Sequence, residues 1–344
     1  MTMQDVFKPI DVARSGFRRL PHATIVAMVV LAVVGVALAG SSYWISVATS
    51  TCATALVVAG TALLFGRLGM VSLCQFALAG IGGWATLRIH HALHPPFEVS
   101  FILGGLCASV IGVVWGLPAL RIRGLYLALV TLMLAGAFQV VINVAGFPNG
   151  GPGLLGQVVD GPRVMMDRPA IARSDQAYLI YVAGLLLSGL LLIELHRVSK
   201  AGRAWALIRR SEQMAQASGV RVVFYKAWAF ALSGWLAGIG GGAMACTFGQ
   251  LDSSAFGASE SILLFALTVV GGATSWLGVV IAALLMRAVP ALFNQIGMNG
   301  FVAMMLFGVA LVHALVNTGD GIAGQIMEIL KGGRSAAGDR AGRT

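Results

Sequence analysis

LPHATIVAMVVLAVVGVALAGSSYWISVATSTCATALVVAGTALLFG, residues 20–66, contains no Asp, Glu, Lys or Arg. A hydrocarbon core of roughly 30 Å needs about 20 apolar residues of helix to cross it, so this run is too long for one crossing and suits two. The whole chain has the same character, because only 10% of its residues are charged, whereas a soluble domain usually carries about a quarter. The stretch therefore predicts a protein that crosses a membrane repeatedly.

Uncharged runs of this kind recur along the rest of the chain. They cover residues 68–87, 99–120, 124–159, 176–193, 227–251, 261–286 and 288–319. About ten membrane spans fit these runs, near residues 24–45, 47–65, 72–89, 99–118, 125–146, 178–195, 227–247, 259–271, 277–296 and 300–317. We therefore expect an all-α fold: a polytopic integral membrane bundle of about ten transmembrane helices, with short broken or re-entrant segments, over residues 23–318.

The basic residues predict how this bundle is oriented. If the amino terminus is cytoplasmic, 18 of the 23 lysines and arginines fall on cytoplasmic segments, as the bias of basic residues toward that side requires. Residues 1–22 and 319–344 are then cytoplasmic, residues 196–226 form a cytoplasmic loop, and residues 147–177 form the longest outer loop. The net charge of +10 lies beside anionic lipid, and no basic groove with interleaved aromatics points to nucleic acid.

One stretch of the cytoplasmic loop is unusually polar for this chain: GRAWALIRRSEQMAQASGV, residues 202–220. On a helix, small and apolar side chains form one stripe while Arg209 and Glu212 point away from it. The stripe consists of Ala204, Leu207, Ile208, Ser211, Met214, Ala215 and Ser218. Gly219 stands where a left-handed cap would end the helix. Such a helix either lies on the lipid headgroups or packs on another protein, and its small side chains favour protein.

The same stretch carries a resemblance to a known family. The segment GRAWALIR, residues 202–209, with Glu212, Ala215 and Gly219, resembles the cytoplasmic coupling loop of ABC importer permeases. Four more segments resemble motifs of the branched-chain amino acid ABC transporter permease family, in particular its LivM-like subunit, in the family's order. They are GRLGMVSL (66–73), LRIRGLYLA (120–128), GGPGL (150–154) and GGAT (271–274). The resemblance covers about residues 50–315.

This resemblance implies a division of labour among several chains. The loop would sit in a cleft of a separate ATPase, with Ala204, Ile208 and Ala215 packing there and Arg209 or Glu212 pairing at the rim. The implied coupling residues are Arg203, Ala204, Ile208, Arg209, Glu212, Ala215 and Gly219. The implied partners are a second related permease subunit, two ABC ATPase subunits and a periplasmic or extracellular solute-binding protein, all at the bilayer of a bacterial inner membrane.

The sequence itself agrees that other chains supply the motor and the solute capture. It contains no G-x-x-x-x-G-K-[ST] phosphate-binding loop, so we expect a transport subunit and not an enzyme. The outer loop 147–177 is too short to hold a solute-binding domain. No cofactor is expected. The implied cargo is a small neutral or zwitterionic solute, first a branched-chain amino acid, with urea or short amides as the alternative.

Glycine clusters mark the candidate solute pathway. Close helix packing in lipid relies on small residues, which explains most of them. The sharper interpretation is a broken helix near Gly69–Ser72 and a second near Gly271–Gly278, as in discontinuous transporter helices. The candidate pathway residues are Gly69, Ser72, Gln75, Thr131, Asn143, Gly271 and Gly272.

The charged residues, histidines and cysteines in or near the expected spans bear on alternative functions. Arg287 lies inside an expected span, so it is either functional or reaches toward the interface. An ion-coupled secondary transporter would need carboxylates deep in its spans, whereas Glu194, Asp252 and Glu260 are expected at span edges. A membrane enzyme would need paired catalytic groups, and His313 stands alone. His90, His91 and His94 favour an interfacial turn over a metal site, and the four cysteines suit packing.

Overall fold

The computed structural model describes residues 22–297, except 121, 123, 152–154 and 157–165, and beyond them residues 305, 308, 309 and 321–326. All regular elements in these residues are helical. The longer helices are α1 (His22–Ala39), α2 (Ser42–Leu63), α3 (Gln75–Leu93), α4 (Phe97–Gly116), α5 (Leu125–Ala145), α6 (Asp175–Val198), α9 (Val222–Phe248), α10 (Ala258–Gly271) and α11 (Trp276–Gln295). The shorter elements are η2 (Leu64–Leu68), η3 (Leu117–Leu120), α7 (Lys200–Arg210), α8 (Glu212–Ala217) and η4 (Ser253–Phe256).

The all-helical bundle is as predicted, but the count of about ten spans is not confirmed. In the described part of the chain six helices are long and apolar enough to cross a membrane: α2 with η2, α4, α5, α6, α9 and α11. Residues 24–39 of α1 and the whole of α10 are apolar but shorter. The tenth expected span, 300–317, lies almost wholly outside the described residues. A charge gap sets where a span fits, but it does not set how long the helix inside it becomes.

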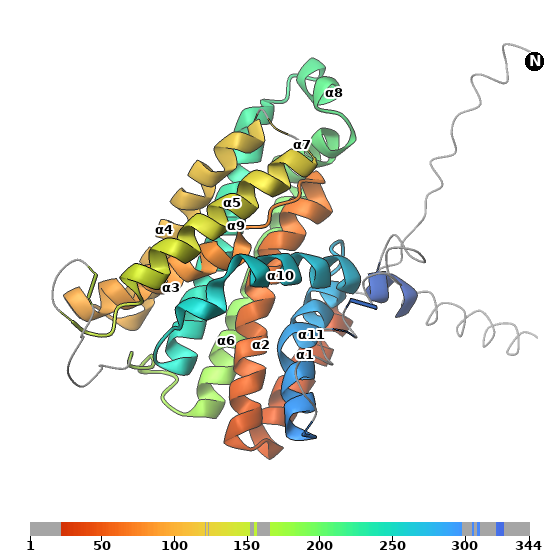
Figure 1. Ribbon diagram of the computed structural model, residues 1–344. Helices are drawn as coiled ribbons and strands as arrows, with labels where there is room; N and C mark the ends of the chain where they lie inside the picture. Colours follow the sequence, from red (N-terminus) through yellow and green to blue (C-terminus); the bar gives the residue numbers. More distant parts are fainter. Residues whose placement is uncertain are drawn as a thin grey trace, which may run out of the picture.

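Helices α2 and α9 form the centre of the bundle. α2 packs against α6, α9 and α11, and α9 also packs against α3 and α4 (Figure 1). Within the membrane-length window of α2 with η2, 89% of residues are buried, compared with 28% in α5. α5 therefore presents a broad apolar face to lipid or to another subunit. α7 and α8 lie together at one end of the bundle in Figure 1.

Glycines allow α3, α4 and α9 to approach closely, which supports the packing interpretation of most of the glycine clusters. A Cβ built on Gly82 would lie 2.2 Å from the Cα of Gly238. A Cβ on Gly241 would lie 1.8 Å from the carbonyl oxygen of Ala79. No larger side chain fits at these positions without moving backbone, because the obstructing atoms are themselves main-chain atoms.

We expect Gly241→Ala to destabilise the bundle by about 2 kcal/mol, since overpacking typically costs 1–3 kcal/mol. Gly184→Ala in α6 is the matched control, because nothing lies within 4 Å of its Cβ position and alanine favours a helix. Thermal unfolding of the two purified variants in detergent measures the difference. Equal midpoints would contradict the close packing of α3 on α9.

Candidate functional site

The α7–α8 segment, residues 200–217, is built from two capped helices. The hydroxyl of Ser199 accepts a hydrogen bond from the Ala201 amide at 3.2 Å, and that of Ser211 accepts one from the Met214 amide at 3.3 Å. Serine favours such caps because its oxygen satisfies an amide that the first helical turn leaves unpaired. Gly219 has φ 76° and ends the segment as the sequence predicts.

Three residues of the predicted stripe face the chain's own bundle, whereas Met214 and Ser218 of the same stripe are exposed. Ala204, Ile208 and Ala215 are buried at 4%, 5% and 0% exposure, and Ile208 and Ala215 pack with Val222 at the start of α9. These three side chains are therefore already covered within the chain and do not form the contact expected with an ATPase, whereas docking of the segment through its other residues stays a prediction. A helical wheel identifies an apolar face, but it does not say which neighbour covers that face.

The outward face of the segment is polar around one apolar side chain. Met214 is 54% exposed. The other exposed residues of the segment are Lys200, Arg203, Ala206, Arg209, Arg210, Gln213, Gln216 and Ala217. A docking partner would meet this face, which combines an apolar protrusion with a basic and amide-rich surround.

Three contacts fasten the segment to the bundle. The Lys226 ammonium of α9 lies 2.7 Å from the Glu212 carboxylate, and their side chains are 1% and 13% exposed. The Trp205 indole donates a hydrogen bond to the Tyr225 carbonyl oxygen at 2.9 Å. The Arg209 guanidinium donates one to the carbonyl oxygen of Gly66 in η2. The segment is thus tied to α9 at two points and to the end of α2 at a third.

The third contact meets a break in the helices. η2 is a π-helical turn ending at Gly69, which has φ 73°, and the chain stays non-helical until α3 begins at Gln75. The Leu73 amide of this break donates to the Thr131 hydroxyl on α5 at 2.9 Å, and the Ser72 hydroxyl lies 3.3 Å from the Cys74 sulfur. The break therefore occurs where the glycine pattern placed it.

A second break separates α10 from α11. Gly272 has φ 105°, and a Cβ on Gly271 would lie 2.4 Å from the Gly278 carbonyl oxygen. The second break lies against η2, since a Cβ on Gly66 would lie 2.3 Å from the carbonyl oxygen of Ala273. The first interruption, 69–74, thus lies beside the α7–α8 segment, and the second, 272–275, lies beside η2.

The remaining pathway candidates are only partly brought together. The Gln75 side chain begins α3 at 1% exposure, and its amide nitrogen and oxygen have no hydrogen-bond partner among the described residues. Thr131 is fully buried beside the first break. Asn143 lies exposed on α5, twelve residues or roughly 18 Å farther along that helix. Asn143 is therefore separate from the other candidates within this chain, although the exposed face of α5 can meet a second subunit.

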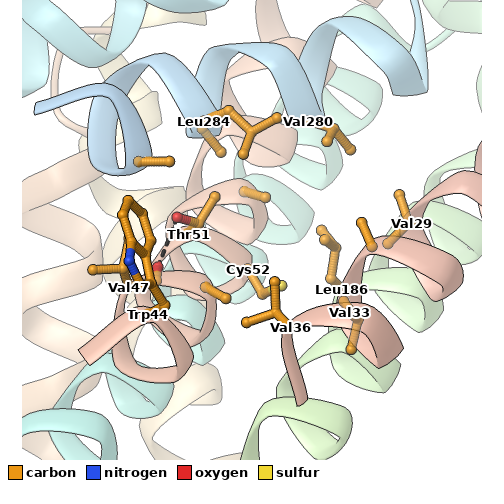
Figure 2. Close-up of a pocket in the computed structure, with 15 residues that line it drawn as sticks. Val29, Val33, Val36, Trp44, Val47, Thr51, Cys52, Leu186, Val280 and Leu284 are labelled. Carbon is orange, nitrogen blue, oxygen red and sulfur yellow. Dashed lines mark hydrogen bonds between the residues drawn. The ribbon is translucent and has the colours of Figure 1, made fainter. Parts of the chain in front are cut away.

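An apolar pocket of about 250 Å³ lies elsewhere, between α1, α2, α6 and α11 (Figure 2). Its wall is aliphatic apart from Trp44, Thr51 and Cys52. The Thr51 hydroxyl already donates to the Val47 carbonyl oxygen at 2.7 Å, the dashed line of Figure 2. A wall of this kind suits a hydrocarbon chain and not a zwitterion, because it offers no polar group to replace lost hydration.

The opposite end of α9 is fastened to residues that precede α6. Arg168 forms an ion pair with Asp175 at 2.5 Å, and the Met166 amide donates to the Gly249 carbonyl oxygen at 3.3 Å. His94 ends α3 with φ 46°, so the helix stops at a turn there. In the described part of the chain no group of three His, Cys, Asp or Glu residues could hold a metal ion.

The sequence patterns did not indicate the contacts of Lys226 and Trp205 in this arrangement. In the sequence Lys226 was only one of the basic residues of the expected cytoplasmic loop. The residues around it, up to Phe230, are mostly apolar, and a lone lysine among them could have suggested an ion pair with a buried carboxylate. Glu260 was expected at a span edge, and in the structure it is a partly exposed residue in the first turn of α10.

This architecture, an all-helical membrane bundle with interrupted helices beside an amphipathic side segment, defines a transport permease. The family described as "Branched-chain amino acid transport system / permease component" matches residues 43–315, so the chain belongs to that family. It is the permease subunit of an ABC importer and a multi-pass inner-membrane protein.

Two curated relatives are similar over most of the chain. The high-affinity branched-chain amino acid transport system permease protein LivM of Escherichia coli K12 is 27% identical over 287 residues, 76% of this chain and 68% of the relative. The protein of the same name from Salmonella typhimurium LT2 is 26% identical over the same shares. No solved structure matches the chain.

Proposed function

We propose that this subunit forms half of a translocation pathway for branched-chain amino acids, driven through the α7–α8 segment by a separate ATPase. The observation that carries the proposal is the chain of contacts from the segment through Arg209 to Gly66, and from Gly66 to Ala273. A push on the segment reaches both helix breaks through these contacts. Interrupted helices are where transporters change shape around a solute.

The proposed partners supply the second half of the pathway, the ATP hydrolysis and the solute capture. One copy exposes a broad face of α5, including Leu129, Met133, Val140 and Val144, which fits a second, related permease. Two ATPases would engage the two side segments, and a periplasmic or extracellular binding protein would deliver solute at the end carrying Arg168 and Asp175. Both termini are then cytoplasmic, together with α7 and α8.

The experiment that tests this function is co-expression of the subunit with the permease, ATPases and binding protein encoded beside it. We expect a complex with two different permeases that takes up leucine, isoleucine and valine in proteoliposomes with ATP inside. Uptake of urea or a short amide with no response to leucine would show that the transported solute is not a branched-chain amino acid. A transport-competent homodimer of this chain would overturn the pairing.

The docking face supplies a further prediction. Met214→Asp should reduce the amount of ATPase that co-purifies with the subunit by about tenfold, because it places a charge at the centre of an apolar contact. Met214→Leu is the control and should retain the ATPase. If Met214→Asp binds the ATPase normally, the partner docks elsewhere.

A further inference from the structure

The apolar pocket between α1, α2, α6 and α11 is an elongated slot (Figure 2). Its lining residues on α2 recur every three to four residues from Trp44 to Ala55, which places them on one stripe of that helix. At 1.5 Å per residue this stripe is roughly 16 Å long. The lining on α11 runs from Val280 to Ala288, which is roughly 12 Å of helix.

The slot extends lengthwise because α2 and α11 lie alongside each other in opposite directions. The Tyr43 hydroxyl in the first turn of α2 donates a hydrogen bond to the Ala291 carbonyl oxygen near the end of α11 at 3.5 Å. At the other end, the Cβ position of Gly66 lies 2.3 Å from the carbonyl oxygen of Ala273, just before α11 begins. The length of the slot is therefore about half of a roughly 30 Å hydrocarbon core.

The slot has buried lining residues on one side and an open rim on the other. Cys52, Ala55 and Leu186 are 8%, 2% and 2% exposed, whereas Ala32 on α1 and Leu284 on α11 are exposed. Alanines leave the space that larger side chains would fill, and they are Ala32, Ala48, Ala55, Ala283 and Ala288. The slot therefore opens to the outside of the bundle between α1 and α11.

The wall of the slot offers nothing to a charged ligand. No charged residue lines it in the described part of the chain. Arg287 precedes Ala288 but turns toward other side chains, since its Nε donates a hydrogen bond to the Thr54 hydroxyl at 3.1 Å. Its guanidinium carbon lies 5.8 Å from the centre of the Phe76 ring on α3. An apolar cavity of about 150 Å³ stays dry and binds small hydrocarbons, so this larger slot suits a hydrocarbon ligand.

The volume of the slot decides what kind of hydrocarbon fits. A helix of the same length and roughly 10 Å across occupies on the order of 1,000 Å³, whereas the slot has about 250 Å³. No further helix of this chain or of a partner therefore fits inside. About eight methylene-sized groups fit, if each takes the roughly 30 Å³ of a water molecule. A single unbranched chain has both this volume and this elongated shape.

We propose that the slot binds one acyl chain of a membrane phospholipid. The chain lies along α2 from Trp44 toward Ala55, with the headgroup at the Trp44 end, because tryptophan favours the level of the headgroups. The length of the slot then corresponds to one leaflet of the bilayer. A lipid chain thereby becomes part of the packing around α11, the helix that follows the second break. The site does not depend on which solute the subunit carries.

The test is photo-cross-linking of the full-length subunit in nanodiscs made with a phosphatidylcholine that carries a diazirine near the middle of one acyl chain. Mass spectrometry locates the cross-links after illumination. We expect them at Cys52 and Ala55, because these residues are buried and lipid on the outer surface of the bundle does not reach them. Val140 on α5 is 66% exposed, so its cross-links measure surface lipid and serve as the reference.

Ala48→Phe should lower cross-linking at Cys52 relative to Val140 by about tenfold, which corresponds to excluding two methylenes of the chain from burial. Val144→Phe is the matched control, because Val144 is 84% exposed on α5 and the added ring lies away from the slot. Thermal midpoints show whether the variants fold. If Ala48→Phe does not fold, Ala32→Phe at the exposed rim is the second variant, with the same expected loss.

Two results would overturn the acyl-chain site. Cross-links at Val140 with none at Cys52 or Ala55 would show that lipid does not enter the slot and that protein covers its rim. Cross-linking at Cys52 that persists in the folded phenylalanine variant would show that the chain reaches this residue by another route.

Discussion

Replacing Lys226 by methionine should loosen the α7–α8 segment by about 3 kcal/mol, because it leaves the Glu212 carboxylate without its cation. Breaking a buried pair by removing one partner typically costs 3–5 kcal/mol, and the 13% exposure of Glu212 favours the lower end. Hydrogen exchange of the amides of residues 211–221 measures this loosening directly. We expect these amides to exchange at least tenfold faster while those of α2 are unchanged.

The double variant Lys226→Met with Glu212→Gln is the control. Removing both charges relieves the unpaired carboxylate, so most of the lost protection should return, as replacement of a whole buried pair is often nearly neutral. Equal exchange in the single and double variants would contradict the ion pair as the cause. It would indicate that Lys226 acts through packing alone.

The main features of the bundle follow from simple patterns in the sequence. The charge-free run 20–66 predicts two spans, and the structure has two helices there, of which α2 with η2 is long enough to cross a membrane and α1 is shorter. Gly69 and Gly272 mark helix breaks because both adopt positive φ, which glycine does at little cost. Such local signals are visible in sequence because the cause lies within a few residues of the effect.

The errors concern contacts between distant segments. The stripe of Ala204, Ile208 and Ala215 was identified correctly, but its neighbour is the chain's own α9 and not a partner. Asn143 points outward on α5, apart from the other candidates, so its place in a pathway stays a prediction. Pairings such as Glu212 with Lys226 depend on how helices pack, which periodicity within one helix does not determine.

The contacts between the α7–α8 segment and the helix breaks suggest a residue whose replacement would uncouple ATP hydrolysis from transport while the complex stays assembled. Arg209 is the one member of the three contacts that touches η2 and not α9, and its Cγ lies 3.4 Å from the Cβ position of Gly69. The arginine thus spans from α7 to the left-handed residue that ends η2. Movement of α7 reaches the first break through it.

Arg209→Ala should lower solute uptake roughly thirtyfold, which corresponds to the loss of about 2 kcal/mol from one charged hydrogen bond, while ATP hydrolysis and ATPase co-purification persist. Arg210→Ala is the matched control, because it removes the same charge from the next residue, also exposed at the end of α7. Uptake and ATP hydrolysis are measured together in proteoliposomes. If uptake and ATP hydrolysis fall in parallel in Arg209→Ala, Arg209 serves ATPase docking. The hydrogen bond from Arg209 to Gly66 would then not transmit the movement of α7.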